Sequence, residues 1–477
     1  MKPHFLLTLL LSATALAVEI DGLPKPASPR PAKLIAPQEK TLANGLRVIV
    51  VERPGIPLLS AALIIRSGSE ADPQNLAGLA KFTGELLTQG TSKRTAPQIA
   101  SEIESLGASL AADAGWDSIQ IHLKTLSANA GHAFEILADV ARNPKFEAGE
   151  IDRHRRQALD DLRLAMEAPG QVARTVAARA LLGDSPCAHP TAGTLASLPR
   201  ITREDIVTLH SRTFVPANAL LVIAGSVAAA NGFMLAEEVF GNWAQGQAPA
   251  PSAANAVSDQ PRAILVDLPN AGQAAVYVGA PGLPKTDAAF TIAEVANAVL
   301  GTGYSSLLNQ EIRLKRGLSY GAASKLTPGR DFGLFAASCQ TKNESAAEVI
   351  RVMQTELRRL SSEPIPAEYL ASRKAVLTGN FSRELETNDG YLSLIADLAM
   401  RDLPLETLTH RVERIDAVTA EEVRAFAEKH LAPDRMTVVV VGRAKDVAKP
   451  LRRIFPKLEV IAQSTLDLDS ATLEKAD

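Results

Sequence analysis

The chain has 477 residues, of which 46% are hydrophobic and 22% are charged, and this composition is typical of a globular protein with a large core. A formal net charge of −3 and an aromatic content of 4% give no reason to expect a nucleic acid or an anionic membrane as partner. The two cysteines, Cys187 and Cys339, are too few for a disulfide framework, and we expect both to be buried thiols.

The first residues are typical of a secretory signal peptide. Met1 and Lys2 precede an apolar run at residues 5–11, and small residues follow up to Ala17. The run is too short to span a bilayer, and no later stretch of about 18 apolar residues occurs. We therefore expect cleavage after Ala17 and a periplasmic protein without a membrane span. The alternative is an uncleaved anchor helix.

The pattern that follows predicts strands and helices in one half of the chain. Strands are indicated at residues 46–52 and 58–66, on either side of a Pro-Gly turn, and a hairpin at residues 109–127. Helical spacing predicts further elements at residues 78–87, 96–106, 132–142 and 148–167, the last of these stopped by Pro169.

A repeat indicates a second half built on the same plan, because residues 201–227 align with residues 418–444 without a gap. In each copy a Thr N-cap opens a helix, and an apolar strand follows it. The matching residues are Thr202 and Thr419, Glu204 and Glu421, Pro216 and Pro433, and Gly225 and Gly442. The second half also predicts a strand at residues 274–279 and helices at residues 290–300 and 305–316.

These patterns predict an α+β fold with two homologous halves, each an antiparallel-rich β-sheet covered by helices. Residues 244–261 are rich in Pro, Ala and Ser and predict an interdomain linker. The expected organisation is a signal peptide at residues 1–17, an N-terminal domain at 18–243, the linker at 244–261, a C-terminal domain at 262–460 and a tail at 461–477.

Several segments together carry a resemblance to a known family. They are LANGLRVIVVE at 42–52, RSGSEAD at 66–72, GLAKFTGELLTQGT at 78–91, HPTAGTLASLPRITREDI at 189–206, VPANALLVIAGSV at 215–227 and LLNQEIRLKRGLSYGAAS at 307–324. With them the chain resembles the M16 (insulinase/pitrilysin-like) zinc peptidases along nearly its whole mature length. The resemblance also implies that the two halves are arranged as a clamshell.

In that family an H-x-x-E-H helix supplies two zinc ligands and a general base, and a later helix supplies a Glu as third ligand. The matching positions are Lys81, Gly84, Glu85 and Asp161. A protonated Lys does not ligate zinc, and Gly has no carboxylate, so the resemblance implies a degenerate site without metal. Glu85 and Asp161 would suit a hard cation better than zinc. The simpler interpretation is an ion pair of Lys81 with Glu85, with the ammonium beside Asp161.

Family members also carry an Arg and, seven residues later, a Tyr that bind substrate next to the zinc. Both are present here, as Arg313 and Tyr320. The guanidinium can hold a carbonyl or carboxylate of the substrate, and the hydroxyl can donate to an oxyanion. The alternative is a surface Arg and a half-buried Tyr. The loop at residues 301–308 is interpreted as a turn and N-cap, because its lone glycines are poor evidence for a phosphate site.

The resemblance therefore implies a non-catalytic subunit of a heteromeric periplasmic M16 metallopeptidase. It would need no cofactor of its own and would be inactive alone, and its Arg313 and Tyr320 would bind the peptide substrate. The expected partner is a zinc-bearing M16 homologue that forms a heterodimer with this chain. The alternative is a peptide-binding or scaffold protein of M16 fold without a peptidase role.

Overall fold

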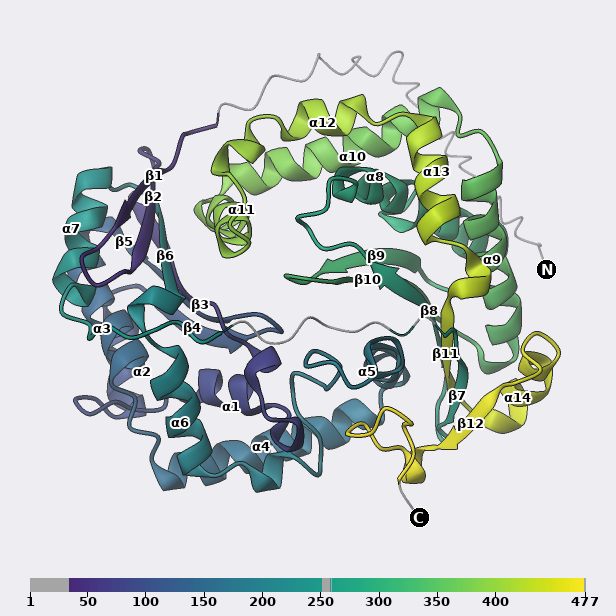
Figure 1. The fold of residues 1–477 in the computed structure, drawn as a ribbon, viewed down its shortest axis with the longest axis horizontal. Helices are drawn as coiled ribbons and strands as arrows, with labels where there is room; N and C mark the ends of the chain where they lie inside the picture. Colours follow the sequence, from purple (N-terminus) through teal and green to yellow (C-terminus); the bar gives the residue numbers. More distant parts are fainter. Residues whose placement is uncertain (1–33, 251–257, 259, 476–477) are drawn as a thin grey trace, which may run out of the picture. The chain divides into compact units, whose positions relative to one another are not determined.

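The computed structural model describes residues 34–250, 258 and 260–475. The predicted signal peptide at 1–17 and the central part of the predicted linker lie outside the described residues. The described residues contain two six-stranded sheets, one in each half of the chain (Figure 1).

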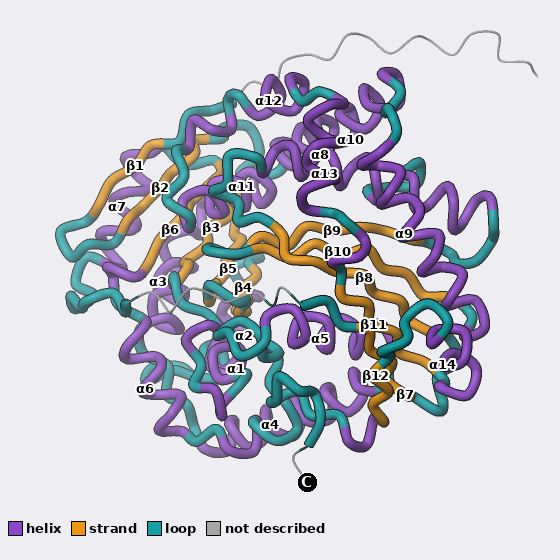
Figure 2. The backbone as a smooth tube through the Cα atoms, turned by 45° about the vertical axis from the view of Figure 1, so that its right-hand side comes forward, coloured by secondary structure: helices purple, strands orange, loops and turns teal. Residues whose placement is uncertain are grey.

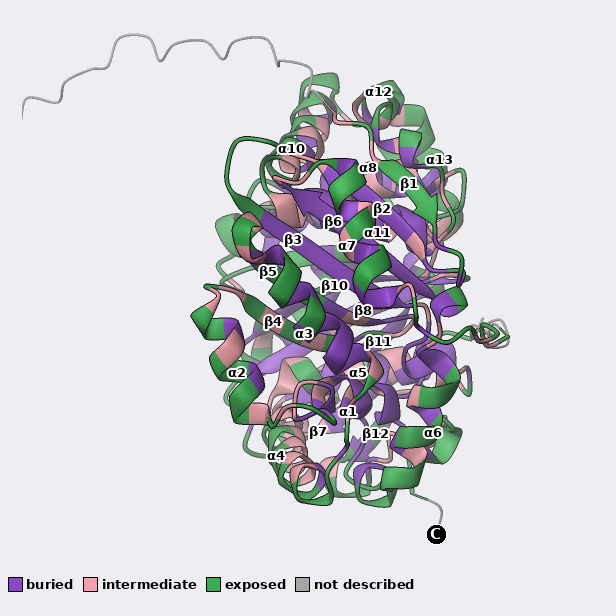
Figure 3. Cartoon of the chain, turned by 90° about the vertical axis from the view of Figure 1, so that its left-hand side faces the viewer, coloured by how far each residue is buried: buried purple, intermediate pink, exposed green. Residues whose placement is uncertain are grey.

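The first sheet has the strand order β1-β2-β6-β3-β5-β4. Its strands are β1 (Gln38–Thr41), β2 (Arg47–Glu52), β3 (Leu58–Ile65), β4 (Ser109–Ala114), β5 (Ile119–Leu126) and β6 (Ala219–Gly225). Neighbours are antiparallel except β2 and β6, which are parallel. Strands β3 and β6 are almost wholly buried, whereas β1 is exposed at one edge (Figure 3). Strand β4 forms the other edge.

The second sheet has the order β12-β7-β11-β8-β10-β9. Its strands are β7 (Ala263–Asp267), β8 (Ala274–Gly282), β9 (Ala322–Pro328), β10 (Gly333–Thr341), β11 (Thr437–Gly442) and β12 (Glu459–Ala462). Strand β7 is parallel to β11 and β12, and the other neighbours are antiparallel. Antiparallel pairs therefore predominate in both sheets, and the predicted α+β class with two homologous halves is confirmed.

Helices of the same half cover one face of each sheet (Figure 2). The helices of the first half are α1 (Leu79–Leu86), α2 (Ala96–Ser105), α3 (Ala130–Arg142), α4 (Ala148–Met166), α5 (Pro169–Leu182), α6 (Arg203–Thr213) and α7 (Ala229–Phe240). Those of the second half are α8 (Phe290–Gly301), α9 (Ala346–Ser362), α10 (Ala367–Glu386), α11 (Asn388–Met400), α12 (Arg411–Ala417), α13 (Ala420–His430) and α14 (Ala444–Arg452). A π-helix covers Asn309–Lys315, where the sequence predicted an ordinary helix.

The repeat predicted from the sequence is present in the structure. Thr202 and Thr419 each accept a hydrogen bond from the backbone N–H three residues later and begin α6 and α13 in capping boxes. The strands that follow, β6 and β11, occupy matching places, each between one parallel and one antiparallel neighbour.

The second face of each sheet is covered by a helix from the other half. Helix α11 packs on β3 and β6, where Ile395 joins a buried apolar cluster with Ile64 and Val222. Helix α5 packs on β8 and β11, where Val176 joins a cluster with Val439. Both positions can be followed in Figure 1. Because both faces are buried, strands such as β6 are apolar throughout rather than alternating.

Two further predictions concern burial and hydropathy. Cys187 and Cys339 are both buried, as predicted. In the ranges that the structure describes, none of the helices combines the length and the hydropathy that a membrane span requires.

Candidate functional site

The helix on which the resemblance implies degenerate ligand positions is α1, and a buried carboxylate lies where it begins. Asp72 accepts hydrogen bonds from the backbone N–H groups of Gly78, at 3.0 Å, and Ala80, at 2.8 Å. Gly78 has a φ of +93°, and a Cβ there would lie 2.7 Å from the backbone of Gly193. The start of α1 therefore depends on a glycine that permits both the left-handed conformation and the close approach.

Lys81 on α1 forms two ion pairs. Its Nζ lies 2.8 Å from Glu85 Oε1, one helical turn away, and 2.8 Å from Asp113 Oδ1 on the edge strand β4. Burial acts to lower the pKa of Lys81, but the hydrogen bonds to Asp113 and Glu85 outweigh it and raise the pKa. The ammonium is therefore charged at neutral pH, and the predicted pairing of Lys81 with Glu85 is confirmed.

The second oxygen of Glu85 faces a residue that the sequence interpretation missed. His154 Nε2 on α4 lies 2.8 Å from Glu85 Oε2, and its ring packs against that of Phe82. Burial acts to raise the pKa of Glu85, but the hydrogen bonds with His154 and Lys81 outweigh it and lower the pKa. His154 lies seven residues before Asp161, two helical turns away on the same face, so its spacing could have indicated it.

Asp161 does not take the place expected for it. Its residue is exposed on α4, and within the described part of the chain no hydrogen bond or ion pair joins it to Lys81. The carboxylate that meets the ammonium from another element is Asp113 instead. The hairpin β4–β5 lies beside α1, and this tertiary packing was not visible in the spacing of the sequence.

Gly84, at the position where the resemblance implies a general base, faces the sheet. The residue is buried, and a Cβ built on it would lie 3.3 Å from Ile119 Cγ2 on β5 and 3.7 Å from the backbone of Asp113. A larger side chain would have to displace this packing. The close approach of α1 to the β4–β5 hairpin therefore accounts for the glycine.

The donor set does not fit zinc. Of the four positions at which the resemblance implies ligands and a base, Lys81 offers only hydrogen-bond donors and Gly84 has no side chain. Asp161 is exposed and has no ion pair with Lys81 in the described ranges. The two oxygens of Glu85 already face Lys81 and His154, so a cation would have to displace an ammonium. Among the residues that the structure describes, no group of three or more His, Cys, Asp or Glu side chains is arranged to hold a metal.

The second candidate site, in the other half, presents two exposed side chains. Arg313 lies on the π-helix, and Tyr320 is 89% exposed just before β9. The Arg313 guanidinium lies over the ring of Tyr304, 4.9 Å from its centroid, and in the described ranges it has no hydrogen bond or ion pair. Arg313 and Tyr320 are therefore both accessible to a ligand. Tyr304 was interpreted only as part of a turn.

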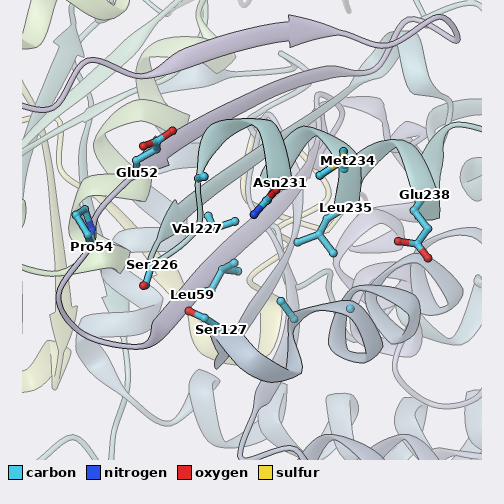
Figure 4. Close-up of a pocket in the computed structure, with 13 residues that line it drawn as sticks. Glu52, Pro54, Leu59, Ser127, Ser226, Val227, Asn231, Met234, Leu235 and Glu238 are labelled. Atoms are coloured by element: carbon cyan, nitrogen blue, oxygen red, sulfur yellow. The ribbon is translucent and has the colours of Figure 1, made fainter.

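A separate cavity of about 670 Å³ lies in the first half, between the β2–β3 turn, α3 and α7 (Figure 4). Asn231, Met234 and Leu235 of α7 line it, together with Ser127 before α3. None of the candidate site residues lines this cavity. It is therefore distinct from both candidate sites.

Comparisons with known proteins agree with the fold. Residues 47–195 match the family model described as Insulinase (Peptidase family M16), and residues 200–377 match the model described as Peptidase M16 inactive domain. An uncharacterized zinc protease of Mycobacterium tuberculosis is 28% identical over 423 residues, which cover 88% of this chain and 96% of that protein. A second, from Bacillus subtilis, is 22% identical over 83% of this chain and 95% of its own length.

Solved structures are similar over most of the chain. A peptidase M16 inactive domain from Pseudomonas fluorescens matches with a TM-score of 0.80 and 26% identity, covering 85% of this chain and 98% of that one. A protease from Helicobacter pylori matches with a TM-score of 0.82 and 20% identity, covering 86% of this chain and 100% of that one. The two family models cover more than half of the sequence between them, and both describe one family. The chain therefore belongs to the M16, insulinase-like, peptidase family.

Proposed function

We propose that this chain is the non-catalytic subunit of a heteromeric, periplasmic M16 zinc peptidase. The observation that carries the proposal is the contrast between its two candidate sites. The ligand helix holds a lysine ammonium between Glu85 and Asp113, whereas Arg313 and Tyr320 remain exposed. A surface that binds peptide without hydrolysing it needs a partner to complete the reaction.

The two retained side chains have distinct tasks in the proposed complex. The Arg313 guanidinium presents several N–H donors in one plane and can hold a substrate carbonyl or carboxylate. The Tyr320 hydroxyl can donate a hydrogen bond to the oxyanion that forms as the scissile carbonyl becomes tetrahedral. The partner's zinc would supply the activated water for hydrolysis. In the proposed complex this chain positions the peptide substrate and stabilises the negative charge of the oxyanion.

The edge strand β4 offers a backbone surface for an extended peptide. Among the strands that the structure describes, β5 alone pairs with β4, so within these residues the other side of β4 has unpaired backbone N–H and C=O groups. An extended peptide could add to this edge by main-chain hydrogen bonds. Such a peptide would pass Asp113 and the Lys81 ammonium, where family members with the H-x-x-E-H motif have their metal.

The test combines metal analysis with reconstitution. The isolated chain should hold no stoichiometric zinc and cleave no peptide, and cleavage should appear when a zinc-bearing homologue from the same genome is added. Arg313→Ala and Tyr320→Phe should each slow hydrolysis by the mixed complex, and for Tyr320→Phe we expect a loss of roughly 100- to 1,000-fold in turnover, the range for loss of one transition-state donor. Arg351→Ala on α9 is the matched control, because Arg351 is exposed and distant in sequence from both residues.

Three results would count against the proposal. One tightly bound zinc per isolated chain would show that the donor set has been misjudged. Unchanged turnover in both variants would remove the role of Arg313 and Tyr320. Peptide binding without any reconstituted cleavage would favour the alternative, a peptide-binding or scaffold protein of the same fold.

A further inference from the structure

The aromatic ring beneath Arg313 gives this surface a third functional residue. Tyr304 is 60% exposed, and its ring lies under the guanidinium of Arg313 at 4.9 Å from the centroid. We propose that Tyr304 is a positioning residue, whose ring holds the Arg313 guanidinium flat so that its N–H edge meets an oxygen acceptor of a bound peptide. This inference rests on the proposed function, in which Arg313 binds substrate.

The loop that carries Tyr304 is held in place by helix α10. Arg373, which is 3% exposed, donates to Thr302 O at 3.3 Å and to Ser305 Oγ at 2.7 Å. The hydroxyl of Tyr369 on the same helix donates to Ser305 O at 3.0 Å. Tyr304 lies between the two anchored residues, so its backbone is fixed on both sides. An exposed aromatic ring on an anchored loop can serve as a rigid platform.

A buried asparagine ties this loop to the strand that follows Tyr320. Asn309 Nδ2 donates to Tyr304 O at 2.7 Å, and Asn309 Oδ1 accepts from Ala322 N at 3.4 Å. Asn309 begins the π-helix that carries Arg313, and π-helical turns often occur at functional sites. Tyr304, Arg313 and Tyr320 are therefore attached to one scaffold.

The neighbouring charges single out Arg313. Glu311, which is buried, pairs with both Lys315 and Arg316. No acidic group pairs with Arg313 in the described part of the chain, and the ring of Tyr304 is the partner that the structure gives it. A ring face attracts the guanidinium without using its N–H donors, which all remain available. Less side-chain freedom is then lost when a peptide binds.

The chemistry of the expected ligand follows from this arrangement. A flat guanidinium with free N–H groups fits a planar oxygen acceptor, such as a peptide carboxylate or backbone carbonyl. Peptides with a free C-terminal carboxylate and the same peptides with a C-terminal amide distinguish these two acceptors. A preference for the free acid that disappears in Arg313→Ala would assign the carboxylate, and equal binding of both forms would assign the carbonyl.

The first experiment observes the stacking directly and needs no peptidase activity. In the full chain, the side-chain N–H resonance of Arg313, assigned by its loss in Arg313→Lys, should be shifted by the ring current of Tyr304. Tyr304→Phe should keep the shift, and Tyr304→Leu should abolish it. Leu314→Ala is the control, because Leu314 is an exposed neighbour on the same π-helix and should leave the shift unchanged. An identical shift in Tyr304→Leu would overturn the inference.

The second experiment measures peptide hydrolysis by the mixed complex. Tyr304→Leu should raise KM about two- to fivefold with little change in kcat, as expected for an exposed cation–π contact, and Tyr304→Phe should restore the original KM. In an Arg313→Ala background the same substitution should have no further effect. A KM increase of equal size in that background would overturn the inference, because the ring would then act independently of Arg313. A ring-current shift without cleavage by any complex would instead support the positioning and contradict the proposed function.

Discussion

Replacing Lys81 by Met tests whether the two ion pairs of Lys81 on helix α1 stabilise the fold. The substitution keeps the length of the side chain but removes both ion pairs, those with Glu85 and with Asp113. Lys81 and Glu85 are each 30% exposed, and Asp113 is 70% exposed, so solvent screens the second pair more than the first. At about 0.5–1 kcal/mol for the first pair and about 0.2–0.4 kcal/mol for the second, we expect a loss of about 0.7–1.4 kcal/mol in unfolding free energy.

The pH dependence of this loss follows from the two pKa shifts. The pKa of Glu85 is lowered in the folded chain, so its contribution is complete above its ordinary value of 4.5 and is lost as the pH falls below that. The pKa of Lys81 is raised, so its contribution is complete below 10.5 and is lost at higher pH. The difference between wild type and Lys81→Met should therefore be constant from about pH 5 to 10 and shrink outside that window.

Urea unfolding at several pH values measures the effect. Lys93→Met is the matched control, because Lys93 is exposed and no ion pair of its side chain is present within the described ranges. We expect a change within about 0.5 kcal/mol for the control, as for most surface substitutions. Equal stability of Lys81→Met and wild type, or a difference that does not vary below pH 4.5, would refute the reasoning.

Two other changes probe neighbouring features. Gly84→Glu should destabilise the fold by about 2–4 kcal/mol in urea unfolding, since the new side chain must displace Ile119 and bring a carboxylate into a buried position; an unchanged midpoint would show that the site can accept the base. Burial raises the pKa of Glu70 to about 7 despite its ion pair with Arg330. The unfolded chain therefore releases this proton first, and stability should fall as the pH rises from 4.5 to 7, by up to about 3 kcal/mol. Glu70→Gln should remove that part of the slope, and an identical slope in both proteins would contradict the assignment.

Local spacing was enough to predict much of this structure. The strands and helices expected in the first half lie within one or two residues of those observed, and the pairing of Lys81 with Glu85 follows from helical spacing. The repeat was also visible, because Thr202 and Thr419 cap equivalent helices. Helical periodicity and N-capping depend on residues that are close together in the chain, so both can be recognised in a single sequence.

Tertiary contacts and ambiguous residues account for what the sequence did not reveal. Asp113 reaches helix α1 from a hairpin, and this approach is not encoded in local spacing, whereas the position of His154 two helical turns before Asp161 could have been noticed. Helix α4 ends before Pro169, as predicted, but Pro169 also begins α5, which was not predicted, because proline is favoured at the first helical position as well. The π-helix around Arg313 and the contact of its guanidinium with the ring of Tyr304 were not predicted either.

The exchange of α5 and α11 between the two sheets has a consequence for how this molecule opens. Each helix seals a hydrophobic layer that belongs to the opposite half, so separating the halves completely would expose both layers to water. After protease cleavage between residues 244 and 261, the two fragments should therefore remain associated, because the packing of α5 and α11 holds them together without the covalent connection. A motion that keeps α5 and α11 on their sheets would leave both apolar layers covered, whereas a full separation of the halves would expose them.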